Sequence, residues 1–468
     1  MGKQSIERYI VLYLPFGLAL LFQGDPVLSY SIAWLGTILI FCLTLSGWIK
    51  PLPKDFTIAE QIMRPIFLVQ IIFAGYMSFS SIFYFFSLFG YDDFHKSTNQ
   101  LIYIDWEKVG LTALCQRYYV LGHAAFVTGI LVFMKYPVKK KYYVEKEKLA
   151  NILFVTAFVL LPVSELFVRI PALVQFYFQF STLSFMAGTL ALAFAIPLKK
   201  IGNTIFCVLL YISNFHEALI SGFKEPIIIS VMVLGIFLYP NYKKLVIVIF
   251  IPALLILFMV LPTYNTVFRE NNWTGDFDGD DAYKIALDAT IEGEKTGENS
   301  NWGFLVYRLS EVDMFTEFVR STPQNVDYYG FQLLEQSAIA IIPRAFWPSK
   351  PSTEELVMER VYNAGVIRRG ANVSAKPAFI VDAYLSAGIP GIIIGLFLYG
   401  AIAQLISLKA EYLFGGYTLG TALIFSGLFQ IFWRGLSFEF IINSVFWSYI
   451  SMFVIFRVLR STRVIKEV

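Results

Sequence analysis

The chain has 468 residues, of which 57% are hydrophobic and only 15% are charged, and its mean hydropathy is +0.63. Soluble globular chains are roughly 45–50% apolar and about 25% charged, so this composition excludes a water-soluble protein and indicates a polytopic membrane protein. A formal net charge of +3 argues against a nucleic-acid partner, and the three cysteines follow neither a disulfide framework nor a zinc-site spacing.

The first apolar stretch follows Lys3 and Arg8 and lacks a small-residue cleavage site, so we interpret it as an uncleaved first span. The later apolar runs have about the 20 residues that a helix needs to cross a bilayer, and they lack the alternation of a barrel strand. The sequence therefore predicts an all-α fold with about twelve transmembrane helices, at 9–23, 28–48, 65–89, 116–134, 149–168, 180–197, 201–220, 226–240, 245–262, 377–406, 417–434 and 439–457.

These spans divide the chain into an N-terminal transmembrane bundle (1–262), a long segment (263–376) and a C-terminal transmembrane bundle (377–468). Lys and Arg residues concentrate in the connections that share a side with the N-terminus, which predicts that both termini are cytoplasmic and that the long segment is extracytoplasmic. An acidic, Gly/Asn/Asp-rich part precedes a part with helical periodicity, so we expect a long, partly helical outer loop.

The stretch 330–351 combines a rigid backbone with two cations and an indole. An apolar helical run stops at Pro343, and two further prolines restrict the chain that follows. The side chains presented between them are Arg344, Trp347 and Lys350. Arginine has a planar fork of donors that matches phosphate oxygens, and lysine adds a compact charge. The stretch is predicted to bind a diphosphate group, with an aromatic and basic interfacial anchor as the alternative.

Other charged residues lie beside apolar spans, where a charge costs about 2.5–3.5 kcal/mol on insertion scales. Lys224 and Glu225 occupy a tight outer turn, and Arg434 ends another apolar run. Arg308 and Glu311 are three residues apart and share one helical face. Each is a candidate for the same site, and each has an alternative interpretation, as a snorkelling ion pair, an interfacial anchor or a surface pair.

The sequence predicts neither a metal site nor a cofactor. The acidic run Asp276–Asp281 has Leu287 where a calcium loop has its twelfth-position glutamate, so it is interpreted as a solvated loop. The three histidines, His95, His123 and His216, are isolated from one another in the sequence.

Several short motifs occur in an order that resembles the O-antigen (oligosaccharide repeat-unit) polymerase family, Wzy. The specific part is Ile-Pro-Arg-Ala-Phe-Trp-Pro-Ser-Lys-Pro at 342–351, and the resemblance covers about residues 200–440. The accompanying motifs are Gly-Phe-Lys-Glu at 222–225, Tyr-Arg at 307–308, Tyr-Tyr-Gly at 328–330, Asp-Ala-Tyr-Leu-Ser-Ala-Gly-Ile-Pro-Gly at 382–391 and Arg-Gly at 434–435.

The resemblance implies a GT-C-like, metal-independent glycosyltransferase in the bacterial inner membrane. It would polymerise polyprenyl-diphosphate-linked oligosaccharide units at the outer face. The donor and acceptor lipids, membrane lipids, a chain-length regulator and a flippase are the implied partners. A ligase of finished glycans and a polysaccharide transporter or flippase are the alternatives, since twelve spans with both ends inside is also a common transporter layout. The long outer segment favours the enzyme.

The resemblance, together with the arguments from the residues themselves, gives an expected role to each candidate. Those expected to be catalytic are Arg308, Arg344, Arg434, Glu311 and Asp382, and those expected to bind the diphosphate or glycan are Lys224, Lys350, Trp347, Glu335 and Tyr384. Asp382 stands where the family's Glu-x-Tyr-x-x-x-Gly-x-x-Gly pattern has a glutamate, so its role is open. The candidate bases for deprotonating an acceptor hydroxyl are Glu225, Glu311, Glu335 and Asp382.

Overall fold

The protein is a helical bundle that carries a helical cap at one end. The computed structural model describes residues 6–92, 95–96, 103–170, 173, 176–199, 201–220, 225–272, 278–292, 301–307, 309, 311–344, 346–370 and 375–468. Within these ranges the strands form two small antiparallel pairs, β1 (Tyr91–Asp92) with β2 (His95–Lys96) and β3 (Tyr142–Tyr143) with β4 (Lys466–Glu467). The predicted all-α class is confirmed.

The N-terminal part contains six helical elements. The long α3 begins at Pro26 because Asp25 accepts hydrogen bonds from the amides of Val27 and Leu28, and α5 begins after Asp105, which caps the amide of Lys108. The predicted span 9–23 forms two short helices, with Pro15 in the first turn of the second. The elements are α1 (Ile6–Val11), α2 (Leu14–Leu21), α3 (Pro26–Leu45), η1 (Gln70–Phe79), α4 (Ser81–Leu88) and α5 (Trp106–Phe133).

The next part contains α6 (Lys146–Val168), α7 (Tyr177–Ala195), α8 (Ile201–Ile220) and α9 (Glu225–Asn272). The backbone of α9 leaves helical geometry at Tyr242. A Cβ atom added at Gly235 would lie 3.0 Å from the ring of Phe250, fifteen residues later. A straight helix would separate these residues by roughly 22 Å, so α9 is a hairpin whose arms correspond to the predicted spans 226–240 and 245–262.

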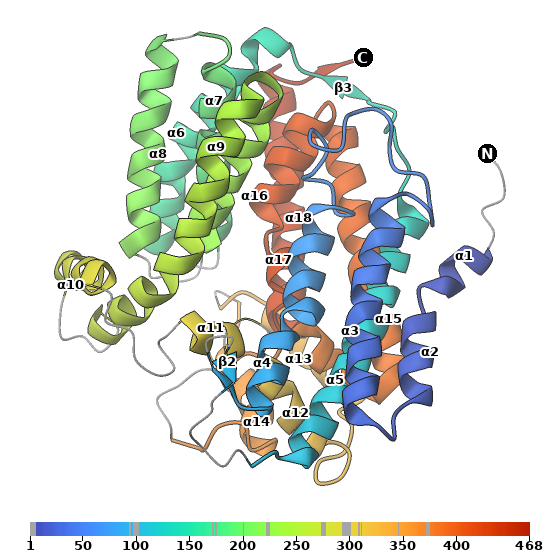
Figure 1. The fold of residues 1–468 in the computed structure, drawn as a ribbon. Coiled ribbons are helices and arrows are strands. Elements are labelled where there is room, and N and C mark those ends of the chain that lie inside the picture. The colour runs from blue at the N-terminus through green and yellow to red at the C-terminus, as the bar shows by residue number, and fades with distance from the viewer. Residues whose placement is uncertain are drawn as a thin grey trace.

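The C-terminal part supplies the cap and the centre of the bundle. Figure 1 shows α11 to α14 together at the lower end, which we call the loop end, with α10 set apart from them beside α9, whereas β3 and the C-terminus lie at the opposite end. We call that opposite end, with Lys141 and Lys466, the basic end. The elements are α10 (Gly279–Glu292), α11 (Asn301–Tyr307), α12 (Val312–Ser321), α13 (Gln332–Ile341), α14 (Thr353–Asn363), α15 (Phe379–Leu413), η4 (Thr418–Phe425), α16 (Ser426–Leu428), α17 (Ile431–Arg434) and α18 (Phe438–Ser461).

The predicted span 417–434 is not one regular helix. It consists of the π-helical η4 and the short α16 and α17, and the chain leaves helical geometry at Phe429. A Cβ added at Gly420 would lie 2.5 Å from the backbone of Glu411, so η4 folds directly onto the end of α15. This close approach brings Thr421 within 2.9 Å of the Glu411 carboxylate.

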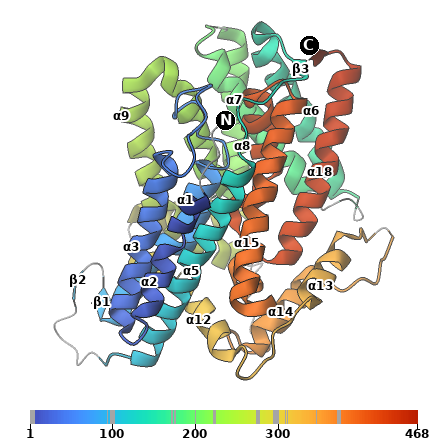
Figure 2. The same ribbon diagram turned by 90° about the vertical axis from the view of Figure 1, so that its right-hand side faces the viewer.

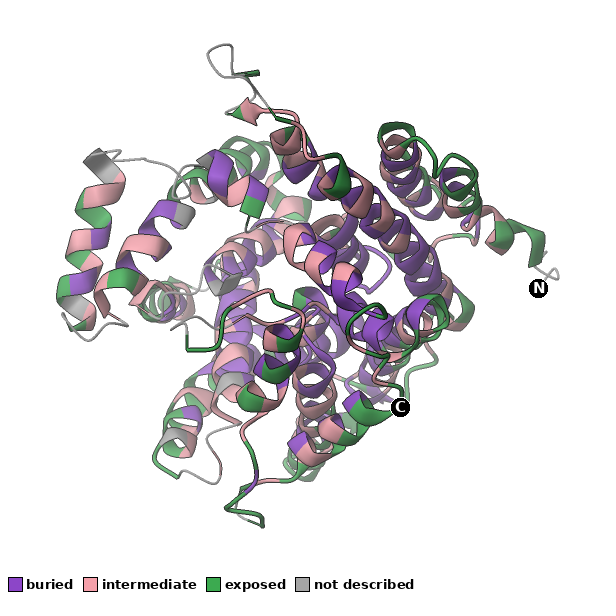
Figure 3. Ribbon diagram, turned by 90° about the horizontal axis from the view of Figure 1, so that it is seen from below, coloured by how far each residue is buried: buried purple, intermediate pink, exposed green. Residues whose placement is uncertain are grey.

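Helices α5 and α15 cross at two glycines in the centre of the bundle. A Cβ at Gly129 would lie 2.1 Å from the carbonyl oxygen of Phe397, and a Cβ at Gly400 would lie 2.1 Å from that of Phe126. Small residues allow backbones to approach this closely inside a membrane. Viewed from the loop end, buried residues gather at the centre of the molecule and exposed residues at its rim (Figure 3).

We expect Gly129→Ala to destabilise the protein by about 1–3 kcal/mol, because the added methyl group meets backbone atoms that cannot rotate away. Gly110→Ala in the same helix is the matched control, since a Cβ there meets nothing within 4 Å. The replacement of a helical glycine by alanine should then be neutral or stabilising. Thermal unfolding in detergent micelles measures both variants, and equal midpoints would contradict the close-packing argument.

Seven helices of the described chain are long and apolar enough to cross a membrane, and Gln179–Ala195 and Thr418–Leu428 are shorter apolar helices. Large hydrophobic residues on these helices remain exposed, among them Phe158, Val248 and Val454. A lipid environment accounts for such exposure. The chain is therefore an all-α membrane protein.

Candidate functional site at the loop end

The 342–351 box forms a compact turn between α13 and α14. The carbonyl oxygen of Pro343 accepts hydrogen bonds from the amides of Phe346 and Trp347, at 3.0 and 3.2 Å. Directly after the box, Ser352 and Glu355 form a reciprocal capping box that starts α14. The rigid turn that the prolines predict is present, and it joins two helices of the cap.

Lys350 points back into this turn. Its side chain is only 8% exposed, and its ammonium donates to the carbonyl oxygens of Ala340 (3.1 Å) and Ile342 (2.7 Å). The structure therefore places Lys350 as a cap on the end of α13, next to Arg344.

Three arginines at the loop end are exposed and have no carboxylate partner among the described residues: Arg344, Arg368 and Arg434. Arg344 makes one long hydrogen bond, 3.5 Å, to the carbonyl oxygen of Pro348. The other described arginines of the cap differ from these three, because each forms ion pairs with glutamate or aspartate. The pairs are Arg320 with Glu107 and Glu317, Arg360 with Asp382 and Glu439, and Arg369 with Glu359. Arg344, Arg368 and Arg434 thus keep their donors available for an anion.

The remaining predicted residues lie in different surroundings. Trp347 and Glu335 are exposed on the box and on α13. Glu311 is the N-cap residue of α12, with a left-handed backbone (φ 49°). Tyr384 is buried, and its hydroxyl donates to the carbonyl oxygen of Thr322 at 2.7 Å. Lys224 and Arg308 lie outside the described residues, as does the side chain of Glu225.

The Tyr-Tyr-Gly motif forms backbone hydrogen bonds with a broken part of α15. The helix loses regular geometry at Ala387 and Gly388, and Pro390 has no amide hydrogen with which to bond the carbonyl of Ser386. The amide of Gly330 donates to that carbonyl at 3.0 Å, and the amide of Tyr329 donates to Leu385 at 2.9 Å. Two motifs that are more than fifty residues apart in the sequence therefore form one backbone hydrogen-bonded unit.

Asp382 belongs to a buried ion-pair triad that sequence reasoning missed. Arg360 on α14 donates to Asp382 on α15 at 2.9 Å and to Glu439 on α18 at 2.7 and 2.8 Å, and all three side chains are at most 1% exposed. Burial alone would lower the pKa of Arg360, but the two carboxylates raise it above its ordinary value. One feature of the sequence indicates that Arg360 is buried. It lies in the apolar stripe of α14, together with Val357 and Val361.

The same Asp382 oxygen also accepts the amide of Phe438, at 2.8 Å, and so caps the first turn of α18. The amide of Phe379 donates to Gly435 at 2.6 Å, which places the Arg434 turn beside the start of α15. The triad therefore fixes α14 and the Arg434 turn relative to each other. It does so with a carboxylate that has no exposed surface in this conformation.

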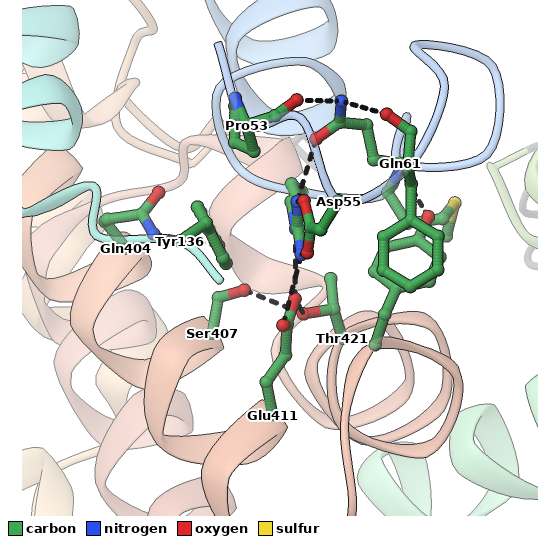
Figure 4. Close-up of polar contacts among 12 residues, drawn as sticks. Pro53, Asp55, Gln61, Tyr136, Gln404, Ser407, Glu411 and Thr421 are labelled. Atoms are coloured by element: carbon green, nitrogen blue, oxygen red, sulfur yellow. Dashed lines mark hydrogen bonds and ion pairs between the residues drawn. The ribbon is translucent and has the colours of Figure 1, made fainter. Parts of the chain in front are cut away.

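A second buried arginine, Arg64, ties α15 to the basic end. Figure 4 shows its partners Asp55, Gln61 and Glu411. Arg64 is fully buried and donates to Asp55 (2.6 Å), Glu411 (3.1 Å) and Gln61 (2.8 Å). Its guanidinium lies 3.7 Å from the centre of the Tyr136 ring. The sequence predicts only that Arg64 contributes to the basic charge on the cytoplasmic side. Its partner Glu411 is 347 residues away, so the sequence does not reveal this ion pair.

No group of three or more His, Cys, Asp or Glu side chains that could hold a metal ion occurs within the described ranges. Both ends of α15 use a guanidinium, Arg360 or Arg64, to neutralise carboxylates. At the loop end, by contrast, Arg344, Arg368 and Arg434 are exposed and have no carboxylate partner among the described residues.

The fold defines a polytopic helical membrane protein, and its loop end carries exposed guanidinium groups. A family model described as "Domain of unknown function (DUF8712)" matches residues 14–467, and the chain belongs to this family. No curated protein and no solved structure matches the chain.

Proposed function

We propose that this protein is a repeat-unit polymerase of the bacterial inner membrane. It extends a glycan that is linked to a polyprenyl diphosphate on the extracytoplasmic side. The observation that carries this proposal is the set of exposed arginines at the loop end, Arg344 and Arg434 among the predicted ones, whose guanidiniums have no carboxylate partner within the described residues. In the proposed topology both termini are cytoplasmic, and about twelve spans form a GT-C-like framework.

In the proposed reaction, a hydroxyl oxygen of the acceptor unit attacks the anomeric carbon of the growing chain. The bond from that carbon to the diphosphate oxygen breaks, and the polyprenyl diphosphate leaves with the bonding electrons. Negative charge grows on the diphosphate, where the guanidinium groups of Arg344 and Arg434 stabilise it. The hydroxyl proton passes to a carboxylate. Glu335 supports this role best, because it is exposed and lies on α13, directly before the box, whereas Asp382 is buried and held by Arg360.

A direct assay separates this proposal from its alternatives. Purified protein in nanodiscs is mixed with a synthetic polyprenyl-diphosphate repeat unit, and products are resolved by mass. A polymerase makes products of two, three and more units in the absence of nucleotide. Transfer only to a lipid A core acceptor would indicate a ligase. Movement of the unit across liposome membranes without any glycosidic product would indicate a flippase.

Chain extension should proceed at an unchanged rate in EDTA, because guanidinium groups supply the positive charge that a divalent ion provides in other transferases. The measurement compares the initial rate of unit addition with EDTA and with added Mg²⁺ or Mn²⁺. A strict metal requirement would contradict this mechanism and would direct attention to the acidic stretch 276–281.

A further inference from the structure

The end of α13 is built in a way that suits lipid better than water. A helix leaves its last carbonyl groups without partners inside the helix, and at an aqueous surface water satisfies them. Here side chains satisfy three consecutive carbonyls. Lys350 donates to Ala340 and Ile342, and the indole of Trp447 donates to Ile341 at 3.0 Å. Hydrocarbon demands such complete internal satisfaction.

The position of the C-terminal end of α13 along α18 also indicates that this end lies within the membrane. Trp447 lies nine residues after Phe438, the first residue of α18, which is among the helices able to cross a membrane. Nine residues correspond to about 14 Å along a helix, and a side chain tilts back by less than that. Figure 2 shows α13 next to the lower part of α18. The C-terminal end of α13 therefore lies at the depth of the α18 span, not beyond its end.

The outward surface of the C-terminal half of α13 and of the turn is mainly apolar, with Arg344 as its exposed charge. Phe346 is 82% exposed, Ile342 is 38% exposed and Trp347 is 37% exposed, while Ser337 and Ala340 on the other face are buried. This surface continues onto the exposed face of α18 at Phe446 and Ile450. Aromatic and basic side chains together are typical of the membrane interface.

From these observations we propose that the C-terminal half of α13 and the turn 342–351 form a re-entrant element, with Ile342, Phe346 and Trp347 in contact with lipid acyl chains. Lys350 then neutralises the helix end inside the membrane, as charged groups at that depth do when they bond backbone carbonyls. Arg344 extends from the same turn to the level of lipid phosphates. This inference does not depend on the proposed function.

A fluorescent probe tests the position of the element. An NBD label is attached at Phe346→Cys in full-length protein carrying Cys42→Ser, since Cys115 and Cys207 are buried, and the protein is placed in phospholipid nanodiscs. Emission should be blue-shifted, and nitroxides on lipid acyl chains should quench it several-fold more strongly than aqueous iodide. The matched control is Asp327→Cys, exposed on the cap, which should show the opposite preference. Iodide quenching of the Phe346 probe equal to that of the Asp327 probe would overturn the proposal.

The variant Lys350→Met tests whether the hydrogen bonds from Lys350 to the end of α13 keep the element in the membrane. It keeps a long side chain but leaves two carbonyls without donors, so the Phe346 probe should lose acyl-nitroxide quenching and gain iodide quenching. Lys376→Met, which removes an exposed ammonium paired with Glu354, is the control and should leave the probe unchanged. Unaltered acyl quenching in Lys350→Met would contradict the capping argument.

Discussion

Replacing Arg344 by alanine is expected to reduce chain extension by about 10²–10³-fold, the loss typical of removing one preorganised donor from a developing charge. The guanidinium is exposed and makes a single 3.5 Å hydrogen bond to the backbone, so folding should be unaffected. Arg344→Lys should also lose much of the activity, because an ammonium cannot make two parallel contacts with a phosphate. The measurement is the rate of unit addition, together with the length distribution of the glycan.

Arg369→Ala is the matched control for this series. Arg369 is exposed in the same cap, but its guanidinium is already bonded to Glu359 at 2.7 and 2.8 Å. Its removal should leave chain extension near the wild-type rate. A wild-type glycan ladder in Arg344→Ala would remove this residue from the site. Full activity in Arg344→Lys would reduce its role to that of an interfacial anchor.

Arg64→Met should lower the free energy of unfolding by about 3–5 kcal/mol, since it leaves the buried Glu411 carboxylate without its counter-charge. The guanidinium has no exposed surface and binds Glu411 and Asp55 directly. Thermal unfolding in detergent micelles gives the size of the effect relative to wild type. The double variant Arg64→Met/Glu411→Gln should recover part of the loss, because it removes the uncompensated charge as well.

Arg457→Met provides the comparison at the same end of the bundle. Arg457 is exposed on α18, and no partner of its guanidinium occurs among the described residues. Its replacement should change stability by less than about 0.5 kcal/mol. If Arg64→Met were as mild as Arg457→Met, the ion-pair cluster would contribute little to holding α15.

Properties that depend on composition and local pattern could be predicted from the sequence. The membrane class follows from hydropathy, and the turn at 342–351 follows from three prolines. The two arms of α9 could be separated because apolar runs flank Pro240–Lys244, and the structure turns the chain at Tyr242. Each of these features is decided by residues that are close together in the chain.

Features that depend on distant partners could not be predicted. Lys350 looks like a phosphate ligand in isolation, and only the fold shows that the carbonyls of Ala340 and Ile342 occupy its ammonium. Asp382 looks like a catalytic acid, yet its partners Arg360 and Glu439 come from two other helices. The position of Arg360 in the apolar stripe of α14 indicates that it is buried, but no local spacing reveals which carboxylate it meets.

The hydrogen bonds from Tyr329 and Gly330 to the broken part of α15 set a limit on how this family can diversify. They join the segment between α12 and α13 to α15 through main-chain atoms, so the side chains around this junction can vary as long as Gly388 and Pro390 keep the break in α15. Insertions or deletions between α14 and α15 can therefore change the surface that we propose to bind the substrate without moving this junction. Members of the family would then share one scaffold and differ in the ligand that they prefer.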